Sequence, residues 1–409
     1  MSDSFTPLAL LRSLRHPAFA LLWGGQTISV LGNQIFQVAL AWWVLEKTGS
    51  AVAMGTVFVL TTVPMLVFSL VGGVIGDRVP RLWLLLISDL ARGLIISLAA
   101  LLAFTDALEI WHVYAFSLLL GFISAFFRPA LRAVVPEVTP ADDLPSANSL
   151  TQLGQQLSGI GGPALGAAVV FWGGTPLAFA LDGLSFFISV ICLLPLLKSA
   201  SAPQGEAAKS VLGDLREGLQ AVMASPWLWV TIAVAGLSGI AYAGPMAVAL
   251  PFLIKDRWHA DVSVLGLFYS ISSLGSVLAA IGLGHFSKLR RRGLTLYGSW
   301  MLIGVLVMAI GLPITIPGIL IASFVIGACN TILGLVWVNT LQELVPRQLL
   351  GRVTSVDYLG SSILEPVGYA FGGWATAAVG PSLVFILGGA LHTVLIALGL
   401  LHPKIRNLD

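Results

Sequence analysis

Charged side chains are scarce in this chain. Asp, Glu, Lys and Arg make up 10% of its 409 residues, whereas a soluble domain carries roughly 25%. Hydrophobic residues account for 57% of the chain, and the mean hydropathy is +0.94. A water-soluble surface needs more charge than this, so the composition predicts a polytopic, membrane-embedded protein. The formal net charge of +2 is too small to indicate a nucleic-acid partner.

Several motifs of chemistry are absent as well. No Gly-Lys dipeptide occurs, which excludes a Walker A loop and an ATP motor within this chain. There is no His-Glu-x-x-His pair, no Gly-x-Ser-x-Gly and no cluster of Cys and His. Cys192 and Cys329 both lie in apolar runs, where they indicate buried small side chains and neither a disulfide nor a metal site. We therefore expect no enzyme activity, no cofactor and no metal.

Long apolar runs dominate the sequence instead. A membrane-spanning helix needs about 20 mostly apolar residues. The first run follows Arg12 and Arg15 and is far longer than the roughly 7–15 apolar residues of a signal peptide, so we expect it to be retained. By this criterion we predict twelve spans, at roughly 18–45, 50–75, 82–104, 110–131, 147–172, 175–197, 227–254, 262–286, 294–312, 317–340, 352–378 and 382–402.

The loops predict orientation and domain organisation. Most Lys and Arg fall at the span ends and loops on the side of the N-terminus, so the positive-inside rule places both termini in the cytoplasm. The long polar loop divides the chain into a six-helix bundle at 1–197, a linker at 198–226 with a short amphipathic helix, and a second six-helix bundle at 227–409. This predicts an all-α polytopic fold of twelve transmembrane helices in two six-helix repeats.

The two halves resemble each other when the first is shifted by 206 residues. Gly121 then falls on Gly327, and Glu137 falls on Glu343. Two six-helix repeats are typical of a transporter that rocks around a central site.

The loop after the second span carries a recognisable motif, "GGVIGDRVPRLW". Gly73 permits close helix approach, and charges at a helix end can cap it or form a latch; a simple positively charged loop is the alternative. The motif resembles the signature loop of the major facilitator superfamily, which implies a cytoplasmic gating loop. The matching residues are Gly73, Asp77, Arg78 and Arg81.

Two longer stretches resemble one bacterial efflux branch of that superfamily. "FFRPALRAVVPEVTPADDLPSANSL" and "LGNQIFQVALAWWVLEKTGSA" are similar to segments of enterobactin exporters and macrolide-efflux-like proteins. "SGIGGPALGA" resembles the Gly-Pro signature of antiporters, with packing of small residues around a proline kink as the alternative. The resemblance implies the major facilitator fold, export across the inner membrane, and antiport against protons.

Polar side chains inside the spans are candidate cavity residues. Gln26, Ser29, Asn33 and Gln37 recur every three or four positions and share one helical face. Because polar groups facing lipid are costly, this face should look into a cavity or onto another helix; hydrogen bonding between helices is the alternative. We predict that the substrate cavity is lined by Gln26, Asn33, Gln37, Gln152, Gln155, Gln156, Tyr242, Tyr269, Asn330, Trp337, Tyr358, Ser362 and Tyr369.

A few ionisable residues lie within the predicted spans. Glu365 falls near the middle of the span 352–378 and can exchange a proton or attract a cationic substrate; a neutral, hydrogen-bonded packing role is the alternative. Asp89 and Arg92 are spaced to pair with each other. Asp182 either begins a helix or belongs to a proton route. The predicted proton- or cation-coupling residues are Glu365, Asp182, Asp89 and Arg92.

The sequence thus predicts a multi-pass protein of the bacterial inner membrane that exports small amphipathic organic molecules by alternating access in exchange for protons. Its expected partners are the small-molecule substrate, membrane lipid and protons, and we expect a monomer. A dedicated exporter of a siderophore or other metabolite and a lipid or lysolipid flippase are the alternatives. An enzyme would need a clustered catalytic set, which the sequence does not contain.

Overall fold

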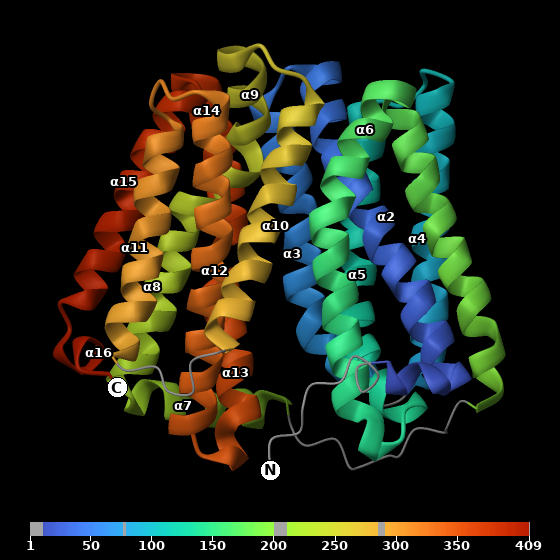
Figure 1. Ribbon diagram of the computed structural model, residues 1–409, viewed down its shortest axis with the longest axis horizontal. Helices are drawn as coiled ribbons and strands as arrows, with labels where there is room; N and C mark the ends of the chain where they lie inside the picture. The colour runs from blue at the N-terminus through green and yellow to red at the C-terminus, as the bar shows by residue number, and fades with distance from the viewer. Residues whose placement is uncertain (1–10, 77–78, 200–210, 285–290, 409) are drawn as a thin grey trace. The chain divides into compact units, whose positions relative to one another are not determined.

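The computed structural model describes residues 11–76, 79–199, 211–284 and 291–408, and every regular element in these ranges is helical (Figure 1). The elements η1–η3 are short 3₁₀ helices, η4 is a π-helix, and the others are α-helices. In chain order they are η1 (Arg12–Arg15), α2 (Pro17–Thr48), α3 (Ala51–Gly76), α4 (Arg81–Phe104), α5 (Ile110–Val138), η2 (Ala141–Asp143), α6 (Leu144–Leu193), η3 (Leu194–Ser199), α7 (Val211–Ala224), α8 (Pro226–Ala243), η4 (Gly244–Ala249), α9 (Leu250–Trp258), α10 (Val262–Gly284), α11 (Arg292–Ile310), α12 (Ile316–Leu344), α13 (Arg347–Ser362), α14 (Glu365–Val379), α15 (Pro381–Leu400) and α16 (Pro403–Arg406).

The described helices account for the twelve predicted spans. Within the described ranges, ten segments are long and apolar enough to cross a membrane, and one of them, Ala141–Leu197, is 57 residues long. That segment contains two spans, because Gly174 interrupts it with φ 74°, a left-handed conformation that glycine adopts without strain. A further span consists of α13 and α14. The twelve-helix fold class is confirmed.

The span made of α13 and α14 is broken at Ile363 and Leu364. Pro366 explains the break, since proline has no N–H to donate to the carbonyl group four residues earlier, and its ring crowds that carbonyl. Glu365 is consequently the first residue of α14. The break therefore places a carboxyl group at a helix N-terminus inside a span.

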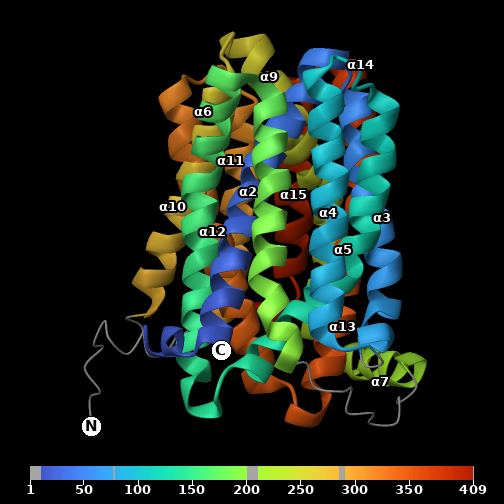
Figure 2. The ribbon, with the colours of Figure 1, turned by 90° about the vertical axis from the view of Figure 1, so that its right-hand side faces the viewer.

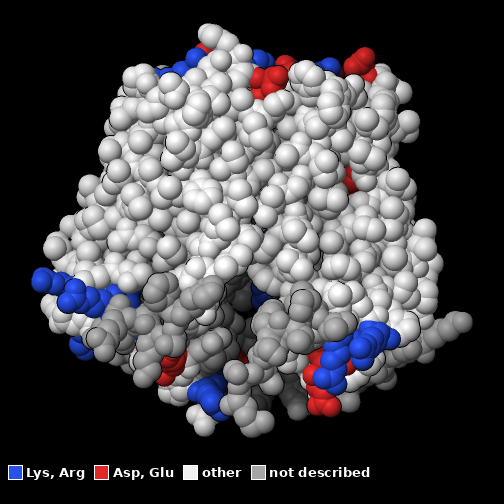
Figure 3. All heavy atoms as spheres, viewed as in Figure 1, with Lys and Arg blue, Asp and Glu red and all other residues white. Residues whose placement is uncertain are grey.

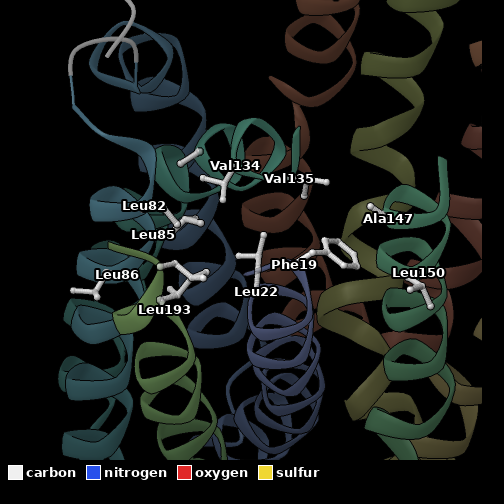
Figure 4. Close-up of a cluster of buried hydrophobic side chains, with 12 residues drawn as sticks. Phe19, Leu22, Leu82, Leu85, Leu86, Val134, Val135, Ala147, Leu150 and Leu193 are labelled. Carbon is white, nitrogen blue, oxygen red and sulfur yellow. The ribbon is translucent and has the colours of Figure 1, made fainter. Parts of the chain in front are cut away.

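The chain divides into two compact units. The first comprises 1–43 and 63–208, and the second comprises 44–62 and 209–409. The bundle boundaries at 197 and 227 stay a prediction. In the first unit α4 packs along α6 and α5. Its apolar core joins α2, α4, α5 and α6 (Figure 4) and includes Phe19, Leu22, Leu85, Val134 and Leu193.

In the second unit α10 packs closely along α12, and α11 packs along α12 and α15. Small residues allow this approach: a Cβ atom on Gly327 of α12 would collide with the carbonyl group of Ser272 on α10. The amphipathic helix α7, inside the predicted linker, lies across α13 (Figure 2) and contributes Val222 to a buried apolar cluster with Val353 and Val356.

The seventh span is irregular at its centre. It runs through α8, η4 and α9, and the π-helix η4 contains Pro245. Gly244 of η4 meets Gly372 of α14 so closely that neither position has room for a Cβ atom. Short π-helical segments inside α-helices often occur at functional sites, and this one lies beside the broken eleventh span.

Charged residues are scarce on the middle of the surface that Figure 3 shows. On the face in Figure 3, Lys, Arg, Asp and Glu gather at the two ends, and a broad band between them is almost free of charge. Large apolar side chains are exposed, including Trp111, Phe171, Trp172 and Trp374. Such a band is the surface that a lipid bilayer requires.

Candidate functional site

The first unit contains a buried polar network at its centre. Gln26 of α2 donates through Nε2 to Oδ2 of Asp89 on α4 and to Oγ of Ser189 on α6, both at 2.9 Å. The Ser189 hydroxyl donates to the same carboxyl oxygen at 2.7 Å. All three side chains are buried. The network therefore joins three spanning helices through one carboxyl group.

Arg92 lies close to this network but faces an aromatic ring. Its guanidinium carbon is 3.9 Å from the ring centroid of Phe127 and 5.7 Å from that of Phe186, which is cation–π geometry. Asp89 and Arg92 attract each other electrostatically, but the hydrogen bonds to Asp89 come from Gln26 and Ser189. Their predicted pairing therefore stays a prediction.

Asp182 is completely buried inside α6, eight residues after the break at Gly174. Ser185 donates to its Oδ1 at 3.3 Å, and Gly32 of α2 packs directly against both side chains. This position excludes the interpretation of Asp182 as a residue that begins a helix. Asp89 Oδ1 and Asp182 Oδ2 have no hydrogen-bond partner among the described residues.

A pocket opens beside the network, between α2, α5 and α6. The empty space in and in front of it is about 380 Å³, which includes open solvent. Phe19, Leu22 and Trp23 form much of its wall, and Gln26 and Gln155 are among its polar residues. Gln26 thus belongs both to the wall of the pocket and to the network behind it.

The second unit contains a separate polar group. Tyr369 donates a hydrogen bond to Glu365 one turn earlier on α14, and Asn330 of α12 is hydrogen-bonded to Tyr242 of α8. Tyr269 of α10 donates to the carbonyl group of Met246 in the π-helix at 3.4 Å. The three tyrosines lie close enough to interact electrostatically.

A second carboxyl group of this unit went unnoticed in the sequence. Asp357 of α13 accepts a hydrogen bond from Nε1 of Trp337 at 2.9 Å and one from Ser361 at 3.3 Å. Trp337, a predicted cavity residue, is thereby tied to the broken eleventh span. The signal was present, because Asp357, Ser361 and Glu365 are spaced by four and share a helical face.

The other predicted cavity residues differ in exposure. Gln156, Ser362 and Tyr369 are partly buried. Those exposed on the surface of their own unit are Asn33, Gln37, Gln152, Gln155, Asn330 and Tyr358. Each unit therefore presents polar side chains outward in addition to its buried group, and their assignment to a cavity stays a prediction. Within the described ranges, no three His, Cys, Asp or Glu side chains come together as a metal site would need.

The predicted gating loop is described in part. Gly73 lies in α3, whereas Asp77 and Arg78 lie outside the described residues. Arg81, the first residue of α4, forms an ion pair with Glu137 near the end of α5, with Nη1 2.6 Å from Oε1. This ion pair joins the start of α4 to the end of α5 within the first unit.

Buried polar groups inside an all-helical bundle of membrane-spanning length, together with the loop around Gly73 and Arg81, are the features expected of a polytopic membrane transporter. The chain belongs to the major facilitator superfamily: the model of the family described as "Transmembrane secretion effector" matches residues 6–295, and the Major Facilitator Superfamily model matches residues 235–407. The resemblance stated from the sequence is confirmed, and the family is one of transporters and not of enzymes.

Curated relatives span nearly the whole chain. Macrolide efflux protein A of Streptococcus pyogenes is 26% identical over 96% of this chain and 97% of that protein. Multidrug efflux pump Tap of Mycolicibacterium fortuitum is 28% identical over 97% and 98%. Enterobactin exporter EntS of Shigella boydii serotype 18 (strain CDC 3083-94 / BS512) is 26% identical over 96% and 94%. These relatives are efflux transporters, and this chain is a multi-pass protein of the bacterial inner membrane.

Solved structures share the fold at low sequence identity. A bacterial homologue of the iron transporter ferroportin in an inward-facing state has a TM-score of 0.72 and 13% identity, covering 93% of this chain and 98% of that one. A POT family transporter in complex with 5-aminolevulinic acid has a TM-score of 0.75 and 12% identity, covering 95% and 96%. At such identities the likeness shows the fold alone.

Proposed function

We propose that this protein exports small amphipathic organic molecules by alternating access and that protons moving the other way drive the export. The relatives named for macrolide efflux, multidrug efflux and enterobactin export support a substrate that is organic and larger than an ion. In this proposal the protein works as a monomer with both termini in the cytoplasm, and it needs no nucleic-acid partner.

The observation that carries the proposal is the position of Glu365. This carboxyl group begins α14 at the break in the eleventh span, and it is hydrogen-bonded to Tyr369. Ionisable residues inside membrane spans are costly and usually mark ion or substrate pathways. A carboxyl group beside tyrosine rings can hold either a proton or a cationic substrate, and one site that takes both in turn performs exchange.

The test is export by everted membrane vesicles. Radiolabelled erythromycin is a suitable first probe, since macrolide efflux is named for one relative. Vesicles with an acidic interior should accumulate it through the wild-type protein. Glu365→Gln keeps the size and hydrogen bonding of the side chain but removes its titration, so we expect accumulation to be lost. Glu109→Gln, at the start of α5, is the matched control and should accumulate normally. Equal accumulation by Glu365→Gln and wild type would contradict the role of Glu365.

A dedicated siderophore exporter is the second candidate, because enterobactin export is named for another relative. The two candidates differ in substrate breadth. Transport in the same vesicles separates them: a general exporter should accumulate erythromycin and be inhibited by several unrelated amphipathic drugs, whereas a dedicated exporter should accumulate a catecholate siderophore and no erythromycin.

A further inference from the structure

The pocket of the first unit has a wall that is mostly apolar. Phe19, Leu22, Val30, Leu131 and Val135 contribute to it. Trp23 also lines it, and its Nε1 already donates to the carbonyl group of Leu150 at 2.9 Å. The indole is thereby held in one orientation and offers the pocket its apolar surface. A wall of this kind suits an aromatic or aliphatic group of a ligand.

Two residues of the polar lining already use their donors. The Thr151 hydroxyl donates to the carbonyl group of Ala147 at 2.9 Å. Both amide hydrogens of Gln26 are accounted for by its bonds to Asp89 and Ser189. The acceptor of the same amide is not in use. Oε1 of Gln26 is buried, and it has no hydrogen-bond partner in the part of the chain that the structure describes.

An acceptor left without a partner in a buried site is costly, commonly by about 1–3 kcal/mol. A ligand that supplies a donor removes this cost, whereas a ligand without one does not. A second pocket, around Phe36, Ile96 and Phe179, provides a contrast. Its lining is apolar except for Ser117, and none of its lining residues has a buried side-chain polar atom without a partner among those described.

We propose that this pocket binds the apolar end of the exported molecule and that a hydroxyl or ammonium group of that molecule donates a hydrogen bond to Oε1 of Gln26. The inference rests on the proposed export function and specifies its substrate class: an amphipathic molecule in which a hydrogen-bond donor adjoins an apolar group. Gln26 is the residue that recognises the donor.

The network also links this recognition to a proton. An ionised carboxylate only accepts hydrogen bonds, so ionised Asp89 requires the amide of Gln26 to turn its NH₂ toward it and leaves Oε1 for the ligand. A protonated Asp89 carries a donor instead. If the amide turns by about 180°, Oε1 accepts a hydrogen bond from the protonated carboxyl group of Asp89. It is then no longer available to accept one from the ligand. A proton on Asp89 and the ligand at Gln26 then weaken each other's binding equally, as exchange requires.

The charged groups around Asp89 are few. Arg92 interacts with it from α4, Asp182 interacts with Arg92 from α6, and Arg128 faces Arg92 from α5. Helix α2 carries no charged residue between Pro17 and Leu45. Two carboxyl groups thus share one neighbouring guanidinium, with a second arginine further off. Asp89 is the carboxyl group that contacts Gln26, so it is the one whose proton the amide can sense.

The test measures protection of a cysteine in the pocket. Thr151→Cys is made in protein whose Cys192 and Cys329 are replaced by Ala, and its labelling by N-ethylmaleimide is followed in detergent with 1-naphthol or 1-methoxynaphthalene as probe. The two probes have nearly the same shape, but only 1-naphthol has a donor. We expect 1-naphthol to protect at concentrations roughly threefold to tenfold lower, the value of one net hydrogen bond.

Three variants sharpen the test. Gln26→Leu should remove the difference between the probes, whereas Gln34→Leu, the same substitution two turns further along α2, should keep it. The advantage of 1-naphthol should shrink at acidic pH, and Asp89→Asn should abolish that pH dependence. Gln155→Cys serves as a second reporter in case Thr151→Cys does not fold.

Equal protection by both probes, an advantage that survives Gln26→Leu, or no reaction at either cysteine would overturn the inference. These outcomes are separate from the export assay, because labelling of purified protein requires no transport. Proton-driven export without selective protection would reject the Gln26 site alone. Selective protection without proton-driven export would reject the proposed function and leave only a binding pocket.

Discussion

Glu137 and Glu343, which are 206 positions apart in the chain, form equivalent ion pairs in the two units. Oε1 of Glu137 is 2.6 Å from Nη1 of Arg81, and Oε2 of Glu343 is 2.6 Å from Nη2 of Arg292. Each pair joins the end of one spanning helix to the start of its neighbour in the same unit. The shift of 206 residues superposes the two glutamates but leaves their arginine partners five positions apart (292 − 81 = 211), so the two units share the position of the ion pair and not its exact register.

Reversing one charge of the first pair should impair export more than stability. Exposed pairs contribute only about 0–1 kcal/mol to folding, and both side chains of this pair are about one-third exposed. We expect Arg81→Glu to slow drug export by resistant cells while purified protein melts within a few degrees of wild type. The double variant Arg81→Glu with Glu137→Arg should recover much of the rate. A double variant no better than Arg81→Glu would mean that the pairing itself has no role.

Close packing of α10 on α12 predicts a sharp difference between two glycines of one helix. A Cβ atom on Gly327 would collide with the carbonyl group of Ser272, whereas one on Gly334 meets nothing within 4 Å. Thermal melting in detergent should show Gly327→Ala clearly destabilised. Gly334→Ala should be unchanged or more stable, since alanine favours a helix by up to about 1 kcal/mol over glycine. Equal melting temperatures for the two variants would contradict this packing.

Arg352 holds α7 against α13. Its guanidinium lies 2.8 Å from Asp214 and 2.7 Å from Glu217, both on α7. We expect Arg352→Gln to increase amide hydrogen exchange in α7 about fivefold, which corresponds to roughly 1 kcal/mol for these partly exposed charges. Arg347→Gln, at the exposed start of α13, is the control and should leave exchange in α7 unaltered. If both variants behave like wild type, the apolar contacts of α7 alone hold it in place.

The spans and their interruptions could be predicted from the sequence because hydrophobic length and proline or glycine positions act locally. The turn at Gly174 and the start of a helix at Arg81 fall close to predicted boundaries. The break before Glu365 was not predicted, although Pro366 carried the signal. A proline in the sequence identifies a position where a helix can break. Whether the helix breaks there depends on its packing against the neighbouring helices.

The sequence allowed us to predict several residues that belong to the buried networks. It did not allow us to predict which of them form hydrogen bonds with one another. Spacing identified the polar face of α2, yet only packing decides that Gln26 meets Asp89 while Asn33 stays exposed. The same reason explains Arg92, whose contact with the ring of Phe127 depends on the position of α5. Helical periodicity defines faces of one helix, whereas hydrogen bonds between helices depend on their mutual rotation.

Proton movement driven by the substrate alone tests the central claim most directly. Purified protein in liposomes with a pH-sensitive dye inside, and no imposed pH gradient, should receive an outwardly directed erythromycin gradient. Exchange predicts that protons enter as the drug leaves, so the lumen should acidify in wild type and should not do so in Glu365→Gln. Erythromycin efflux through the wild-type protein with no change in lumenal pH would contradict proton-coupled export.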